Sequence, residues 1–182
     1  DALAACRAGA AGLVVPKAAA ADFAPLDRLL APLEAELSRP PLEMIALIED
    51  PAGVLDARAI ARAPRVAGLM TGGEDLALAL DGRPEPEVLR LPKLLVHYAA
   101  RAEGKQSFGL LRSIAGFREL AAIAAAAAEA LAQGFEGATC VHPSVVPVLN
   151  AAFAPDAAEL DWARRVLAGA GTAGAFLIDG RM

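Results

Sequence analysis

The sequence predicts an α/β protein whose parallel strands are buried on both faces. Short, continuous apolar runs alternate along the chain with longer segments of helical spacing, and strands that do not alternate apolar with polar residues are typical of parallel sheets. The chain has 182 residues, 56% of them hydrophobic and 21% charged, which suits one domain with a large core. The pattern alone permits either a doubly wound sheet or a closed barrel.

Each expected strand is a short apolar run that a turn residue ends, and each expected helix repeats apolar residues every three or four positions. The expected strands cover residues 12–16, 44–48, 66–70, 107–111 and 138–141, followed by a terminal apolar run at 175–178. The expected helices cover residues 22–38, 56–63, 75–80, 88–103, 117–133 and 157–168. This amounts to about five β-α units, whereas a closed barrel of eight units usually needs about 250 residues.

Composition argues against several classes of function. The net charge is −5 with acidic and basic residues mixed, and aromatic residues make up only 4%, so nucleic-acid binding is not expected. The longest apolar stretch, residues 121–128, is far shorter than the roughly 18 residues of a membrane-spanning helix, and no secretory leader is expected. Cys6 and Cys140 lack metal-type spacing. With only two cysteines in the chain, a reducing cytoplasm is the default expectation.

Chemically capable residues follow several expected strands at the point where each strand ends. In parallel α/β folds the functional groups collect at the carboxyl ends of the strands, so these positions form the candidate site. They are Lys17, Glu49, Gly72, Gly73, Glu74, Asp75 and His142.

Two consecutive strands end in carboxylates, Glu49 and Asp75, which predicts a shared divalent cation such as Mg²⁺. The pair Gly72-Gly73 lets the backbone approach a ligand closely. Other roles stay open for the same residues. Asp75 is also placed to cap a helix, Glu49 to be a solvated loop residue, and Lys17 to be either a surface lysine or a contact for a substrate carboxylate.

Four segments together resemble one protein family. They are GLVVPK at 12–17, IALIEDPAGVLDARAIA at 45–61, VAGLMTGGEDLALALDG at 66–82, and GFEGATCVHPSVVPVLNAAFAPDAAELDWARRVL at 134–167. In this order they resemble the HpcH/HpaI aldolase superfamily, in its citrate lyase beta-subunit-like branch. The resemblance extends over nearly the whole chain.

The resemblance implies a (β/α)₈ TIM barrel, present here as a C-terminal fragment, with residues 1–182 as a single domain and the first three strands outside it. It implies a homotrimer or a hexamer built from two trimers. It also implies Mg²⁺-dependent cleavage or formation of a C–C bond in acyl thioesters, with citryl, malyl or citramalyl groups carried on coenzyme A or on a carrier protein.

By matching position, the resemblance makes Glu49 and Asp75 the catalytic metal ligands. Gly72, Gly73, Glu74 and Lys17 become substrate-binding residues. Phe108 stands where many relatives have an aspartate before the glycine, which indicates a different substrate from that of citrate lyase itself. Two other functions remain open: a pyruvate aldolase that acts on 2-keto-4-hydroxy acids without coenzyme A, and a non-catalytic barrel remnant or assembly subunit.

Overall fold

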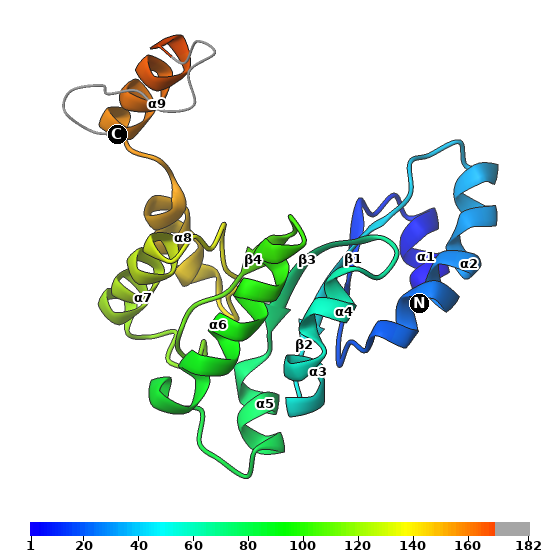
Figure 1. The fold of residues 1–182 in the computed structure, drawn as a ribbon, viewed down its shortest axis with the longest axis horizontal. Helices are drawn as coiled ribbons and strands as arrows, with labels where there is room; N and C mark the ends of the chain where they lie inside the picture. Colours follow the sequence, from blue (N-terminus) through cyan, green and yellow to red (C-terminus); the bar gives the residue numbers. More distant parts are fainter. Residues whose placement is uncertain (170–182) are drawn as a thin grey trace.

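The computed structural model describes residues 1–169 and contains one parallel sheet of four strands in the order β1-β2-β3-β4 (Figure 1). The strands are β1 (Gly12–Val15), β2 (Glu43–Ile48), β3 (Val66–Thr71) and β4 (Gln106–Phe108). Every pairing between neighbours is parallel. The predicted α/β class with parallel strands is therefore confirmed.

Helices connect the strands and cover one face of the sheet, and three further helices follow β4 (Figure 1). They are α1 (Ala2–Arg7), α2 (Ala20–Glu36), α3 (Pro51–Leu55), α4 (Ala57–Ala61), α5 (Gly73–Ala79), α6 (Pro86–Ala102), α7 (Leu120–Ala132), α8 (Val146–Phe153) and α9 (Ala157–Gly169). In Figure 1, α9 lies apart from the sheet beyond α8, and none of its side chains is buried. No helix in residues 1–169 is long and apolar enough to cross a membrane.

The two faces of the sheet differ in burial. Met44, Ala46 and Ile48 of β2 are fully buried under the helices. The residues between them in β2 are only partly buried, and Val14 of β1, which pairs with Ile45 on the same face, is 50% exposed. One face of the sheet is thus covered by helices, and the other is partly open within the described chain.

Two apolar clusters build the core. The larger contains residues of β2, β3 and the helices α2 to α4, and the smaller contains Leu110, Leu111 and residues of α7 and α8. Helix α6 lies between them, because Val96 and Ala100 belong to the larger cluster while Leu94 packs against the smaller one.

The predicted element boundaries need several corrections. Residues 138–141 are expected as a strand, but they form none. The nearest pairing is an isolated bridge between Phe108 and Gly137. The strand expected at 107–111 ends at Phe108, because Gly109 takes a φ of 145° that turns the chain out of the sheet. The helix expected at 56–63 is the shorter α4 (Ala57–Ala61), and the separate helix α3 precedes it, where the Asp50 side chain caps a helix that begins at Pro51. The apolar run at 175–178 lies outside the described residues.

A buried ion network fixes the amino-terminal edge of the sheet. Arg65, just before β3, donates to both carboxylate oxygens of Glu34 at 2.6 and 2.7 Å and to Asp27 at 2.5 Å. Glu34 also accepts from the Leu42 backbone N–H at 2.8 Å. The Arg65 guanidinium holds the pKa of Glu34 below its usual value, and the side chains of both partners are at most 6% exposed.

We expect Arg65→Leu to cost about 3–5 kcal/mol of unfolding free energy, because it leaves the Glu34 carboxylate buried without a cation. Urea denaturation measures the loss. The matched control is Arg58→Leu, which removes a 63% exposed partner of Glu103 and should cost less than about 1 kcal/mol. Equal losses in the two variants would show that the network contributes no more than a surface pair.

Candidate functional site

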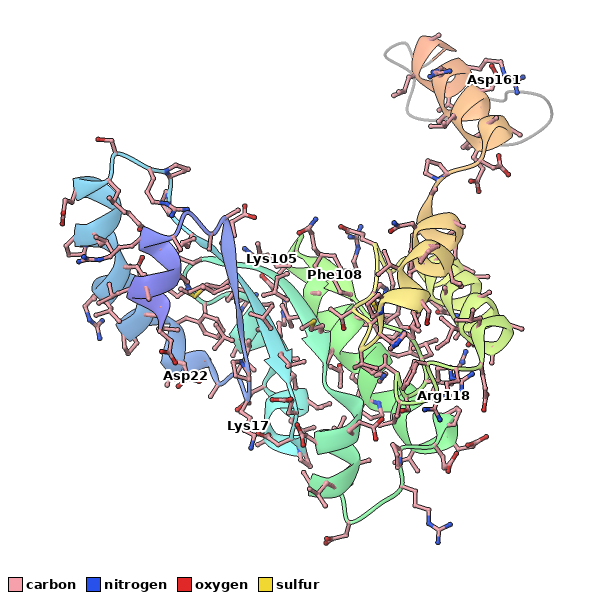
Figure 2. All side chains as sticks on the ribbon, turned by 180° about the vertical axis from the view of Figure 1, so that it is seen from behind. Lys17, Asp22, Lys105, Phe108, Arg118 and Asp161 are labelled. Atoms are coloured by element: carbon pink, nitrogen blue, oxygen red, sulfur yellow. The ribbon has the colours of Figure 1, made fainter. Side chains whose placement is uncertain are left out.

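The candidate site lies at the carboxyl edge of the sheet. Figure 2 shows Lys17, which follows β1, at one end of the sheet and Lys105, which precedes β4, at the other. At the Lys17 end a pocket of about 220 Å³ is lined by Leu47, Glu49, Met70, Thr71, Gly72, Gly73, Glu74, Asp75, Lys93, Gly109, Leu110, Ile114 and Thr139. The parallel pairing therefore brings five of the seven singled-out residues to one cavity.

Glu49 is the first residue after β2, and the backbone determines where its carboxylate lies. Its Oε2 accepts a hydrogen bond from the Lys17 backbone N–H at 2.8 Å, across the ends of two neighbouring strands. Burial raises the pKa of the Glu49 carboxyl, and the nearby Asp75 carboxylate raises this pKa further. The two carboxylates therefore lie close enough to repel each other, which a solvated loop residue would not do.

Asp75 occupies the first turn of α5, together with Glu74. The capping role that the sequence left open is wrong, because Gly72 is the N-cap of α5 and no side chain caps this helix. An acidic residue in the first turn is still favourable, since the amino-terminal end of a helix carries partial positive charge. Asp75 is thus free to face the pocket and Glu49.

Gly72 makes room for the Glu49 carboxylate. A Cβ atom at this position would lie 2.7 Å from Cγ of Glu49 and 2.8 Å from its Oε1, closer than real contacts allow. The Gly72 N–H also donates to the Ile48 carbonyl at 2.9 Å, which fixes the turn against the end of β2. Any side chain at this position would therefore displace the carboxylate of a candidate ligand.

The remaining singled-out residues lie in different places. Lys17 contributes its backbone N–H to Glu49, but it does not line the pocket and its side chain is exposed. Glu74 lines the pocket and accepts from the Ser113 hydroxyl. His142 lies outside the pocket and caps the turn at Pro143–Val145, where its Nδ1 accepts from the Ser144 N–H at 3.2 Å.

Sequence reasoning missed the other wall of the pocket. Lys93 of α6 is 5% exposed, and Leu110 and Ile114 come from the segment that follows β4. One signal could have found Lys93: it stands four residues after Leu89 and four before His97, on the buried stripe of α6. No comparable signal marks Ile114, because only the turn at Gly109 brings its segment over the pocket.

The residues present fit a magnesium ion. Mg²⁺ is usually bound by one or two carboxylates, with waters and substrate oxygens completing its shell. Glu49 and Asp75 supply two, and no group of three His, Cys, Asp or Glu side chains within residues 1–169 is placed to enclose a metal alone. The pocket also contains three carboxylates against one ammonium, an excess of two negative charges that a divalent cation would neutralise.

Fold and pocket together define the class: a parallel α/β protein with paired carboxylates at the carboxyl edge of its sheet. Within that class, the chain belongs to the HpcH/HpaI aldolase/citrate lyase family, which it matches over residues 1–143.

Two curated relatives illustrate the similarity. The chain is 34% identical over 154 residues to a citrate lyase subunit beta-like protein of Mycobacterium tuberculosis, covering 78% of this chain and 54% of the relative. It is 34% identical over 131 residues to a (3S)-malyl-CoA thioesterase of Cereibacter sphaeroides, covering 71% and 45%. The chain thus spans about half the length of these relatives.

Solved structures share the fold. CitE of Mycobacterium tuberculosis, in complex with magnesium, acetoacetate and coenzyme A, superposes with a TM-score of 0.71 at 30% identity, covering 95% of this chain and 62% of that one. RipC of Yersinia pestis superposes with a TM-score of 0.70 at 27% identity, covering 82% and 66%.

We expect Gly72→Ala to weaken Mg²⁺ binding about 10- to 100-fold, the range seen when the support of a metal ligand is lost. The added methyl group must displace the Glu49 carboxylate. Isothermal titration calorimetry measures the affinity. The control is Gly82→Ala at the other end of α5, where the nearest atom to the new Cβ is 3.5 Å away. Unchanged affinity in Gly72→Ala would contradict this placement of Glu49.

We expect Glu49→Gln to be more stable than the native chain in EDTA at neutral pH. The folded state raises the pKa of Glu49 above its unfolded value of about 4.3, so the native chain loses stability as pH rises through the folded pKa. Glutamine cannot ionise, yet its amide oxygen can still accept from Lys17.

Urea denaturation at pH 4 and pH 7 measures the difference between Glu49→Gln and the native chain. The stability advantage of the variant should grow toward pH 7. Asp81→Asn, an exposed carboxylate after α5, is the control and should show no such growth. An advantage that does not change with pH would mean that the folded state does not raise the Glu49 pKa.

Proposed function

We propose that this chain is part of a Mg²⁺-dependent C–C lyase acting on a 3-hydroxyacyl thioester. The reaction would cleave or form a malyl-, citramalyl- or citryl-type thioester of coenzyme A or a carrier protein, with acetyl thioester and a keto acid on the other side. The observation that carries the proposal is the meeting of Glu49 and Asp75, from two neighbouring strand ends, in one pocket.

The relatives support the same chemistry. A CitE structure contains magnesium, acetoacetate and coenzyme A, and other CitE structures contain magnesium with oxaloacetate or with pyruvate. These complexes pair magnesium with small keto acids, whose size suits a pocket of about 220 Å³. The thioesterase relatives act on malyl-CoA, which supports a coenzyme A ester as the substrate here.

The chain's own residues have distinct roles in this proposal. When bound, Mg²⁺ would supply Lewis-acid polarisation of a substrate carbonyl. Glu49 and Asp75 would be its ligands, and the Lys17 N–H keeps Glu49 in position before the ligand arrives. Leu110 and Ile114 form an apolar wall, which limits water around charge that develops during C–C cleavage. Gly72, Gly73 and Glu74 would contact the substrate from the α5 turn.

We further propose that the four-stranded sheet belongs to a (β/α)₈ barrel, with residues 1–182 as part of one domain. The partly open face of β1 and β2 supports this, because an apolar sheet face needs a second layer or barrel interior. A homotrimer or hexamer follows from the resemblance alone. A cytoplasmic location is supported by two free cysteines, Cys6 and Cys140.

We expect the intact protein to release acetyl-CoA and a keto acid from at least one of malyl-, citramalyl- and citryl-CoA, with Mg²⁺ and not with EDTA. Product chromatography distinguishes C–C cleavage from thioester hydrolysis, which would release free coenzyme A and a hydroxy acid instead. Turnover of a 2-keto-4-hydroxy acid alone would place the protein in the pyruvate aldolase branch. No turnover of either class would favour a non-catalytic role.

We expect Glu49→Gln and Asp75→Asn each to weaken Mg²⁺ binding by more than about 100-fold, since loss of even an outer-shell partner costs 10- to 100-fold. Lyase activity should fall with metal affinity and recover in part at high Mg²⁺. Asp81→Asn, an exposed acid outside the pocket, should leave both unchanged. Native Mg²⁺ affinity in either pocket variant would refute its role as a ligand.

A further inference from the structure

Lys93 is a buried cation whose hydrogen bonds go to the backbone of the pocket wall. The residue is 5% exposed, and its Nζ donates to the Leu110 carbonyl at 2.8 Å and to the Arg112 carbonyl at 2.7 Å. Both acceptors lie in the segment that follows β4 and lines the pocket. A lysine on α6 thus binds a segment 17 and 19 residues further along the chain.

The ammonium reaches the wall because the α5 turn leaves space for it. A Cβ atom on Gly73 would lie 3.2 Å from Nζ of Lys93 and 3.3 Å from its Cε. Burial lowers the pKa of Lys93 to about 8, and the Glu74 carboxylate acts in the opposite direction. No ion pair joins Lys93 to a carboxylate within 4 Å among the described residues, so the two carbonyls are its principal partners.

A second contact joins the same wall to the carboxylate side of the pocket. The Ser113 hydroxyl donates to Glu74 in the first turn of α5, and it accepts from the Ala115 N–H at 3.0 Å. Lys93 and Ser113 therefore connect the wall to α6 and to α5 respectively. The wall itself packs into the smaller core cluster through Leu110 and Leu111, whereas Glu49 follows a strand of the larger cluster.

We propose that Lys93 is a positioning residue that fixes the wall at residues 110–114 opposite Glu49 and Asp75 and thereby sets which acyl groups fit. The proposal rests on the lyase function proposed above. Two of the three ammonium hydrogens are used on backbone carbonyls, which suits an anchor better than a direct substrate ligand. Because the wall and the carboxylates belong to different core clusters, the polar contacts between them determine the width of the pocket.

The test compares Lys93→Met with the native protein by hydrogen exchange and by keto-acid binding. Methionine keeps most of the apolar length and removes every donor. Amide exchange in residues 109–116 should rise at least tenfold, while exchange in β2 and β3 stays native. Lys93→Arg, which retains donors, should restore most of the protection.

The second measurement is selectivity between two keto acids, which would not change if Lys93 only stabilised the fold. With Mg²⁺ present, calorimetry gives the affinities for glyoxylate and for pyruvate, which differ by one methyl group. In Lys93→Met the ratio of the two affinities should shift at least fivefold, with Mg²⁺ affinity within twofold of native. The matched control is Arg90→Met. Arg90 lies on α6, as Lys93 does, and its exposed side chain pairs with Glu129 of α7.

Each outcome decides the proposal. Native exchange in residues 109–116 of Lys93→Met would overturn it, and so would raised exchange with an unchanged ratio of affinities. If Lys93→Met does not fold, Ser113→Ala replaces it, because loss of the second contact should loosen the same wall and shift the same ratio. If the native protein binds no keto acid, the lyase function is refuted, and the exchange result alone decides whether Lys93 positions the wall.

Discussion

The carboxylates of Glu49 and Asp75 repel each other, and the parallel pairing of β2 with β3 forces them together. Glu49 follows β2 directly, and Asp75 lies in the first turn of the helix after β3. Parallel strands start and end at the same edges, so both acids must lie at the edge where the pocket opens. The folded chain accepts this repulsion at a cost in stability, and a cation between them would remove that cost. The Lys17 backbone N–H holds the Glu49 carboxylate in place, and the lack of a side chain at Gly72 leaves room for it.

At the opposite edge of the sheet, the pKa of the buried carboxylate shifts in the other direction. There the Glu34 carboxylate is buried with Arg65 and is fully hydrogen-bonded, so its pKa falls and its charge contributes to stability. At the pocket, burial and a like charge raise the pKa of Glu49. A carboxylate that is paired with a cation, as Glu34 is, is typical of a structural network. Two carboxylates held close together, as Glu49 and Asp75 are, are typical of a binding site.

The pocket is built from two halves that fold around different cores. The carboxylates follow strands of the larger cluster, and the apolar wall belongs to the smaller one. Helix α6 packs against both clusters, and Lys93 on this helix bonds to the wall. The proposed anchoring by Lys93 would therefore act on the wall segment, which is separate from the strand ends that carry the two carboxylates.

The sequence by itself determined the α/β class, the first three strands and the position of both acids soon after strands. These features depend on local apolar runs and turn residues, which a linear pattern records. Only the tertiary structure decided that Gly109 ends β4, that residues 138–141 make no strand, and that Gly72 rather than Asp75 is the N-cap of α5. It also placed Lys93 and the wall at the pocket. Those outcomes depend on contacts between residues far apart in the chain, and no local pattern specifies which segment will lie over which strand end.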